Sequence, residues 1–121
     1  MDMGNRWVLL EHIGDPEDLS GRHFDLLLED GSFCRSWRLM DMPASNGPPV
    51  PLITSNRHNL RWLEIDQACV SKKRGCAKRI ISGLFSPSLP REGEEIDRII
   101  LQIDQLAGCL EIDSKFCYFR G

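Results

Sequence analysis

The sequence predicts a mainly β protein, a small single domain of residues 1–121 whose sheet closes or nearly closes into a barrel with few short helices. Two observations lead to this fold class. Short apolar runs rich in β-branched and aromatic residues recur along the chain, and glycine and proline separate them. A length of 121 residues is enough for one domain with a buried core. Many short strands joined by turns favour a sheet that closes on itself.

The N-terminal third contains the clearest strand signals. Three strands are predicted over residues 7–11, 23–29 and 33–40. Within the second, His23 and Asp25 alternate with apolar residues, which is typical of a strand with two unlike faces. Asp30-Gly31 is a strong hairpin signal between the second and third strands. Trp7 and Trp37 are expected in the core, because aromatic side chains dominate core packing.

The rest of the chain alternates between proline-rich loops and further apolar runs. Residues 42–51 contain four of the seven prolines, so a loop or an extended crossing is expected there. A second loop is predicted over 86–93, and one helical turn is possible over 66–71. The isoleucines of 96–103 also fit a helical spacing, but their β-branched side chains favour a strand. Strands are predicted over 61–65, 77–85, 96–103, 108–112 and 116–119, and the last could be an exposed edge.

The charge distribution restricts the kind of partner. A formal net charge of −3 argues against a broad DNA-coating surface, since such binding needs many phosphate contacts. Residues 71–79 nevertheless hold five basic side chains, which suits a small phosphorylated end better than a long duplex. A solvated loop is the alternative for Lys72-Lys73. Without an apolar run of membrane-spanning length or a signal pattern, we expect a cytoplasmic protein that binds no membrane.

Five cysteines are present, and none forms a Cys-x-x-Cys pair. Three of them, Cys34, Cys109 and Cys117, lie in strand-like runs, where free cysteine behaves as a small buried hydrophobe. The odd number and the spacing therefore predict neither a disulfide framework nor a zinc ribbon.

Two of the three histidines lie close to one aspartate. His23 and Asp25 project from the same face of their strand, and His12 ends the strand before it. Two imidazoles and a carboxylate make half of an octahedral site for a hard or borderline divalent cation. The alternative is a partly exposed strand that carries these residues for no such purpose.

The same segments resemble a known family. The runs Trp7-Val8-Leu9-Leu10-Glu11-His12, His23 to Gly31 and Ser36-Trp37-Arg38-Leu39 are similar to the 3′-phosphoesterase domain of bacterial DNA ligase D in its short, stand-alone form. The resemblance continues through Arg57 to Leu63, Val70-Ser71 and Arg74-Gly75, and so covers nearly the whole chain in order.

The resemblance implies a metal-dependent phosphoesterase of DNA repair that removes a 3′-phosphate or a 3′-ribonucleotide from nucleic-acid ends. Mn²⁺, or another divalent transition metal, would be held by His12, His23 and Asp25 at the barrel mouth. His58 would contact the scissile phosphate and protonate the leaving oxygen, a role that suits histidine near neutral pH. His58, His23 and Asp25 would thus form the catalytic set. Ligase and polymerase activities would come from other proteins.

Four arginines are candidates for binding the phosphate or the nucleic acid. Arg57 and Arg61 flank His58 in sequence and could make charge-assisted contacts to phosphate. Arg74 could guide the strand. Arg38 could supply charge that is missing elsewhere in the site.

Two departures from the family pattern leave alternatives open: Leu27 stands where the family has an arginine, and Trp62 stands where it often has a tyrosine. Residues 13–21 resemble a loop insertion, which still allows His12 and His23 to meet because a longer loop can join two paired strands. Loss of a phosphate clamp at Leu27 would favour a catalytically weakened module that binds a nucleic-acid end or a protein. Trp62 could then stack on a terminal base. A phosphoesterase acting on small phosphorylated metabolites is a third possibility, because the protein is acidic overall.

Overall fold

The computed structural model describes residues 5–69 and 74–121. These residues form a mainly β domain whose barrel-shaped sheet is nearly closed, as predicted. The strands are β1 (Arg6–Ile13), β2 (Arg22–Asp30), β3 (Phe33–Leu39), β4 (Val50–Pro51), β5 (Ile53–His58), β6 (Gln67–Cys69), β7 (Cys76–Ser86), β8 (Ile99–Gln102), β9 (Cys109–Ile112) and β10 (Phe116–Arg120), and the 3₁₀-helix η1 (Leu60–Leu63) follows β5.

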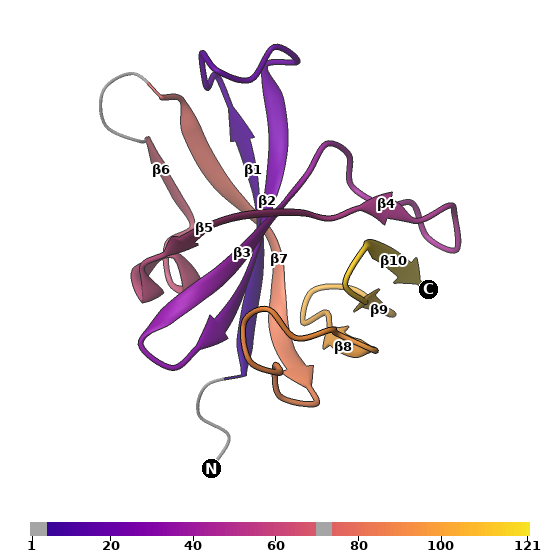
Figure 1. Cartoon of the computed structure of the whole chain (residues 1–121). Coiled ribbons are helices and arrows are strands. Elements are labelled where there is room, and N and C mark those ends of the chain that lie inside the picture. Colours follow the sequence, from indigo (N-terminus) through magenta and orange to yellow (C-terminus); the bar gives the residue numbers. More distant parts are fainter. Residues whose placement is uncertain (1–4, 70–73) are drawn as a thin grey trace.

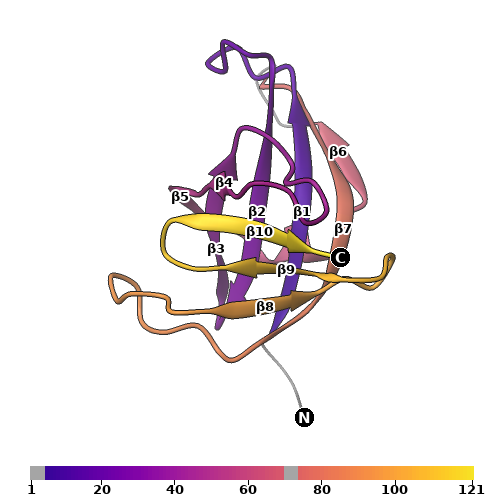
Figure 2. The ribbon, with the colours of Figure 1, turned by 90° about the vertical axis from the view of Figure 1, so that its right-hand side faces the viewer.

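The sheet has the strand order β4-β10-β9-β8-β7-β1-β2-β3-β5, with β6 added beside β7. All pairings between these strands are antiparallel. The barrel nearly closes because β4 and β5 are consecutive pieces of one segment: β4 pairs with β10, and β5 pairs with β3. Figure 2 shows β8, β9 and β10 crossing in front of β1, β2 and β3.

The main core lies inside this nearly closed sheet. On β2, Phe24, Leu26 and Leu28 point inward, in the period of two that a strand imposes. Trp7 and Trp37 are buried here as predicted, and the indole N–H of Trp7 donates to the carbonyl oxygens of Leu84 and Gln102. The other half of the core comes from β8, β9 and β10 and consists of Ile99, Leu101, Leu110, Ile112 and Cys117.

A second, smaller apolar cluster covers the outer face of β1 and β2. It contains the buried residues Val8, Leu10, Leu27, Cys34, Leu63 and Ala77, with Leu60 and Trp62 packed against it. In Figure 1 this outer side carries β6, and β8 to β10 lie on the opposite side of the central strands. The outer face of β1 and β2 is therefore partly a core and partly free to hold polar groups.

The strand predicted over 61–65 is wrong. Asn59 caps a 3₁₀-helix there by accepting a hydrogen bond from the backbone N–H of Arg61. Leu60 and Leu63, three residues apart, then both face the outer cluster, as the three-residue turn of this helix allows. A strand that was not predicted, β5, precedes it and pairs with β3.

The helical turn considered for 66–71 is also absent from the described part of that segment. Gln67–Cys69 pairs with Cys76–Lys78 of β7 as strand β6. Tertiary pairing to an existing strand overrides weak local preference in so short a segment. The remaining two positions, and the Val70-Ser71 motif, lie outside the described residues.

The expectation of no disulfide is wrong for two of the five cysteines. Cys69 and Cys76 lie directly opposite each other in the β6–β7 pair and are joined by a disulfide. Only the strand register brings them together, since their spacing in sequence matches no bridging motif. Cys34 and Cys117 are buried free cysteines, as predicted, and burial raises the pKa of their thiols to about 11 and about 12.

The last strand is not an exposed edge. β10 lies between β9 and β4 in the sheet, and the carbonyl of Lys115 accepts a hydrogen bond from the N–H of Leu52. Nor does any helix among the described residues have the length and apolar character needed to cross a membrane.

Candidate metal centre

His12, His23 and Asp25 come together on the outer face of β1 and β2. His12 and His23 are direct partners across the β1–β2 pair, with ring centroids 4.8 Å apart. Asp25 Oδ2 lies 3.5 Å from His12 Nδ1 and 3.3 Å from His23 Nε2. One ligand atom from each residue fits within a separation of 4.8 Å, so these three side chains could share a single ion.

We expected the centre at the barrel mouth, and this expectation is wrong. The inward face of β2 carries Phe24, Leu26 and Leu28, so His23 and Asp25 point away from the main core. The centre thus lies on the outside of the sheet, beside the smaller apolar cluster. His23 is fully buried and Asp25 is 5% exposed, whereas His12 is half-buried.

The hydrogen bonds of the two rings show which nitrogens are available as ligands. His12 Nε2 lies 2.6 Å from the carbonyl oxygen of Arg74, which can only accept, so Nε2 carries the hydrogen and Nδ1 a lone pair. His23 Nδ1 lies 2.9 Å from Asp18 Oδ2. The hydrogen bond from the Ser20 hydroxyl and then that from His23 lower the pKa of Asp18 below 3.8. Asp18 is therefore an ionised acceptor, which leaves the lone pair of His23 on Nε2.

With the ring hydrogens on His12 Nε2 and His23 Nδ1, the protein itself supplies no hydrogen between the two rings and Asp25. His23 Nε2 is buried and has no hydrogen-bond partner among the described residues. Two nitrogen lone pairs then face a carboxylate, and such an arrangement is costly to bury without a cation between them. The donor set suits a borderline divalent ion, because imidazole and carboxylate ligands together accept Mn²⁺, Zn²⁺ or Fe²⁺.

A pocket of about 330 Å³ opens beside the centre. Two of the metal-ligand candidates, His12 and Asp25, line it, and the buried His23 does not. The pocket is lined by Leu10, His12, Asp15, Asp25, Arg57, His58, Trp62, Arg74 and Ala77. The structure thus brings His58, Trp62, Arg57 and Arg74 to the same cavity as the candidate ligands, from segments up to 62 positions away in sequence.

His58 enters this pocket from the end of β5. Its Nδ1–H donates to the carbonyl oxygen of Asn56 at 2.9 Å, so Nε2 is the nitrogen that can meet a ligand. Its ring and that of Trp62 form a T-shaped pair, with centroids 6.5 Å apart and planes at 78°. The Trp62 indole therefore forms an aromatic wall beside His58.

Two of the four arginine candidates do not line the pocket. Arg61 is exposed on η1 and is not a lining residue, although its neighbour Trp62 is. Arg38 is the direct partner of Asp25 across the β2–β3 pair, and its Nε is buried without a hydrogen-bond partner among the described residues. Arg38 is therefore next to Asp25 on the same sheet face, but it is not among the residues that line the pocket.

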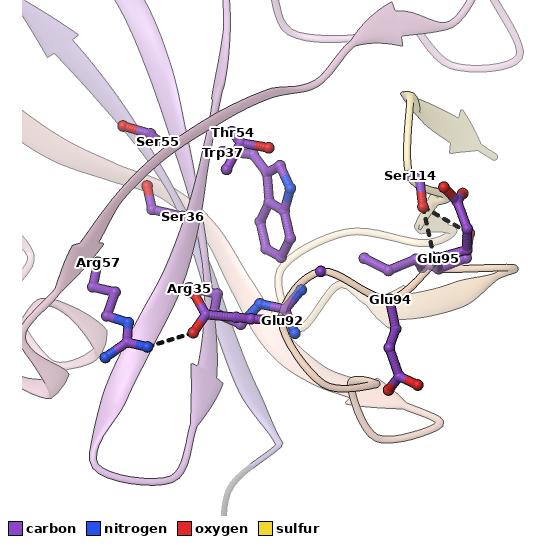
Figure 3. A pocket seen from close by; sticks show the side chains of 12 residues that line it. Arg35, Ser36, Trp37, Thr54, Ser55, Arg57, Glu92, Glu94, Glu95 and Ser114 are labelled. Carbon is purple, nitrogen blue, oxygen red and sulfur yellow. Dashed lines mark hydrogen bonds and ion pairs between the residues drawn. The ribbon is translucent and has the colours of Figure 1, made fainter.

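Arg57 is engaged elsewhere. Its guanidinium forms an ion pair with Glu92 and lies over the ring of Phe33, 4.0 Å from the centroid. Figure 3 shows Arg57 turned toward Glu92 in a second pocket, whose volume is about 310 Å³. The pairing raises the pKa of Arg57 and lowers that of Glu92. A phosphate would have to compete with Glu92 for this side chain.

Leu27 lies on the same strand face as His23 and Asp25, as expected, but it is fully buried in the smaller apolar cluster. It does not line the pocket. Sequence reasoning missed two acidic residues of the long 13–21 loop, Asp15 in the pocket wall and Asp18 on His23. The available signal was the presence of two aspartates in the loop that joins the two histidines.

Comparison with known proteins leaves the family of this chain open. No protein-family model matches the sequence, and no curated protein matches it.

Proposed function

We propose that this protein is a divalent-metal-dependent phosphoesterase that removes a 3′-phosphate or a 3′-ribonucleotide from nucleic-acid ends. One observation carries the proposal. The lone pairs of His12 Nδ1 and His23 Nε2 face the carboxylate of Asp25 at 3.5 and 3.3 Å, and His58 shares the adjoining pocket. A metal site beside a histidine that can move a proton is the minimum that metal-assisted phosphate ester cleavage requires.

The three ligands suit Mn²⁺, the ion that the sequence resemblance implies, and other divalent transition metals as well. Bound there, the ion would act as a Lewis acid on a phosphoryl oxygen and would orient the ester. His12, His23 and Asp25 supply one negative charge between them, which leaves a divalent ion with net positive charge to attract a phosphate.

His58 would supply the proton. Water would attack phosphorus as the ester bond breaks. Because Nδ1–H of His58 is committed to Asn56, the imidazolium form of His58 would give the hydrogen on Nε2 to the leaving oxygen. Arg74, in the same pocket wall, adds positive charge near the phosphate. A volume of about 330 Å³ is at the small end for ligand sites and suits one terminal group better than a duplex. The net charge of −3 agrees with a substrate that contacts the protein over a small area.

The test uses a primer with a 3′-phosphate, with and without Mn²⁺, and follows release of inorganic phosphate. We expect His23→Ala to lose both metal binding and activity, and His58→Ala to lose activity while it still binds Mn²⁺. Glu17→Gln, on an exposed stretch of the β1–β2 loop, is the control and should behave as the wild type. Wild-type protein that binds Mn²⁺, yet neither releases phosphate from this primer nor shortens a primer that ends in a ribonucleotide, would contradict the proposal.

A second candidate is a module that binds a nucleic-acid end without cleaving it. Two observations favour it: Leu27 is buried where a phosphate clamp would be needed, and Arg57 is paired with Glu92. Trp62 would then stack on the terminal base. In this case Trp62→Ala should weaken primer binding by about 1–3 kcal/mol, whereas phosphate release stays absent with every divalent ion tested.

A further inference from the structure

The loop between β1 and β2 contains one buried carboxylate, that of Asp18. Asp18 lies in a stretch that is otherwise largely exposed, and its neighbour Leu19 is fully exposed. The side chain of Asp18 is nevertheless only 5% exposed, because its Oδ2 lies 2.9 Å from Nδ1 of the buried His23. Burying a charge at a loop of this kind needs a specific partner, and His23 is that partner.

The loop determines which oxygen of Asp18 faces His23. Backbone hydrogen bonds from Asp18 N–H to Asp15 and from Gly21 N–H to Asp18 fold the loop back on itself. The backbone N–H of Ser20 donates to Oδ1 of Asp18 at 3.2 Å, and the Ser20 hydroxyl lies 2.7 Å from the same oxygen. Oδ1 is thereby occupied, and Oδ2 is left for the imidazole.

This contact decides the position of the hydrogen on the His23 ring. As long as Nδ1–H donates to Asp18, the lone pair is on Nε2. If the hydrogen moved to Nε2, it would lie on the side of Asp25 Oδ2, 3.3 Å away. His23 would then have no lone pair on the side of Asp25 and would be lost as a ligand for an ion shared with Asp25.

We propose that Asp18 is a positioning residue that keeps the His23 hydrogen on Nδ1 and so directs the Nε2 lone pair at the metal. The inference rests on the proposed function in that it places a metal at His12, His23 and Asp25. Carboxylates that orient metal-bound histidines are worth about 10- to 100-fold in metal affinity. Asp18 would thus make the long β1–β2 loop part of the metal centre.

Asp18→Asn is the sharpest variant, because it keeps the shape of the side chain and reverses its hydrogen bonding. Ser20 N–H must still meet an acceptor, so the amide oxygen takes the place of Oδ1. The amide NH₂ then faces His23 Nδ1 as a donor, which moves the ring hydrogen to Nε2. Asp18→Ala removes the contact without imposing either form. Glu17→Gln, the same change of charge one residue earlier, is the matched control.

Two measurements test the proposal independently. Long-range ¹H–¹⁵N correlation spectra of the metal-free protein report which ring nitrogen of His23 carries the hydrogen. Titration calorimetry with Mn²⁺ and with Co²⁺ reports affinity without any turnover. We expect the Nδ1–H form in the wild type and in Glu17→Gln, and the Nε2–H form in Asp18→Asn. We also expect about 10- to 100-fold weaker metal binding in Asp18→Asn and Asp18→Ala than in the control.

The proposal is overturned if His23 keeps its hydrogen on Nδ1 in Asp18→Asn, or if both Asp18 variants bind Mn²⁺ and Co²⁺ as tightly as Glu17→Gln does. Wild-type protein that binds neither ion would contradict the proposed function. The spectra would still decide whether Asp18 sets the ring of His23, so the two failures are distinguishable.

Discussion

Replacement of Gly75 by alanine tests whether the backbone beside His12 helps to build the metal centre. Gly75 has a φ of 86° and follows Arg74, whose carbonyl accepts the hydrogen bond from His12 Nε2. A Cβ at this position would overlap the carbonyl oxygen of Ile13 and lie 2.7 Å from the carbonyl carbon of Gly14. Both contacts are with backbone, which cannot rotate away as a side chain could.

The expected cost has two parts. A non-glycine residue at positive φ costs about 1–2 kcal/mol. Overpacking against fixed neighbours adds about 1–3 kcal/mol. Gly93→Ala separates the two parts, because Gly93 has a φ of 91° and a Cβ there would have nothing within 4 Å. We expect Gly75→Ala to lower the unfolding free energy by about 2–5 kcal/mol and Gly93→Ala by about 1–2 kcal/mol.

The Gly75→Ala substitution should also weaken metal binding. Moving the backbone at Gly75 shifts the Arg74 carbonyl, so His12 loses the contact that fixes its Nε2–H form. Urea unfolding followed by near-UV circular dichroism measures stability, and calorimetric titration with Mn²⁺ measures affinity. We expect Gly75→Ala to bind Mn²⁺ about 10-fold more weakly than Gly93→Ala does. Equal stability and equal affinity in the two variants would refute the reasoning.

Three further predictions concern stability. Leu27→Arg should lower the unfolding free energy by about 3–5 kcal/mol because it buries an unpaired charge, whereas Leu27→Met should cost under about 1.5 kcal/mol; equal effects in urea unfolding would contradict this. The hydrogen bonds from Arg6 lower the pKa of Glu29 below 4.5, so its stabilisation is present above pH 4.5 and lost as the pH falls below it. Since Arg6 is partly exposed, Glu29→Gln should cost about 1 kcal/mol at pH 7 and less at pH 3.5, and losses that stay equal between these pH values would count against the pairing. Reduction of the Cys69–Cys76 disulfide with a dithiol should lower the unfolding free energy by about 2–3 kcal/mol, and an unchanged midpoint in the reduced protein would show that the bridge does not constrain the unfolded chain.

Strand periodicity made part of the centre predictable. Alternation along 23–29 placed His23 and Asp25 on one face, and Asp30-Gly31 predicted the hairpin to β3, which the structure contains. The prediction that Leu27 shares that face was also correct. Alternation shows which face a side chain occupies but not what covers that face. Helix η1, predicted as a strand, is what covers it.

The hydrogen-bond partners of the His12 and His23 rings could not be predicted from the sequence pattern. Asp18 meets His23 only because the β1–β2 loop folds back through its own hydrogen bonds, and Arg74 contributes a backbone atom, which has no signature in the side-chain sequence. The Cys69–Cys76 bridge depends in the same way on the register between β6 and β7. Each of these contacts needs knowledge of where two separate segments meet.

The amino-acid sequence by itself determined the fold class, the burial of Trp7 and Trp37 and the choice of three candidate ligands, because side-chain periodicity and turn chemistry act over a few neighbouring residues. Only the tertiary structure decided that the centre lies on the outer face of the sheet, which arginines reach its pocket and which ring nitrogens carry lone pairs. Those properties arise from contacts between residues far apart in the chain, which local sequence patterns do not predict.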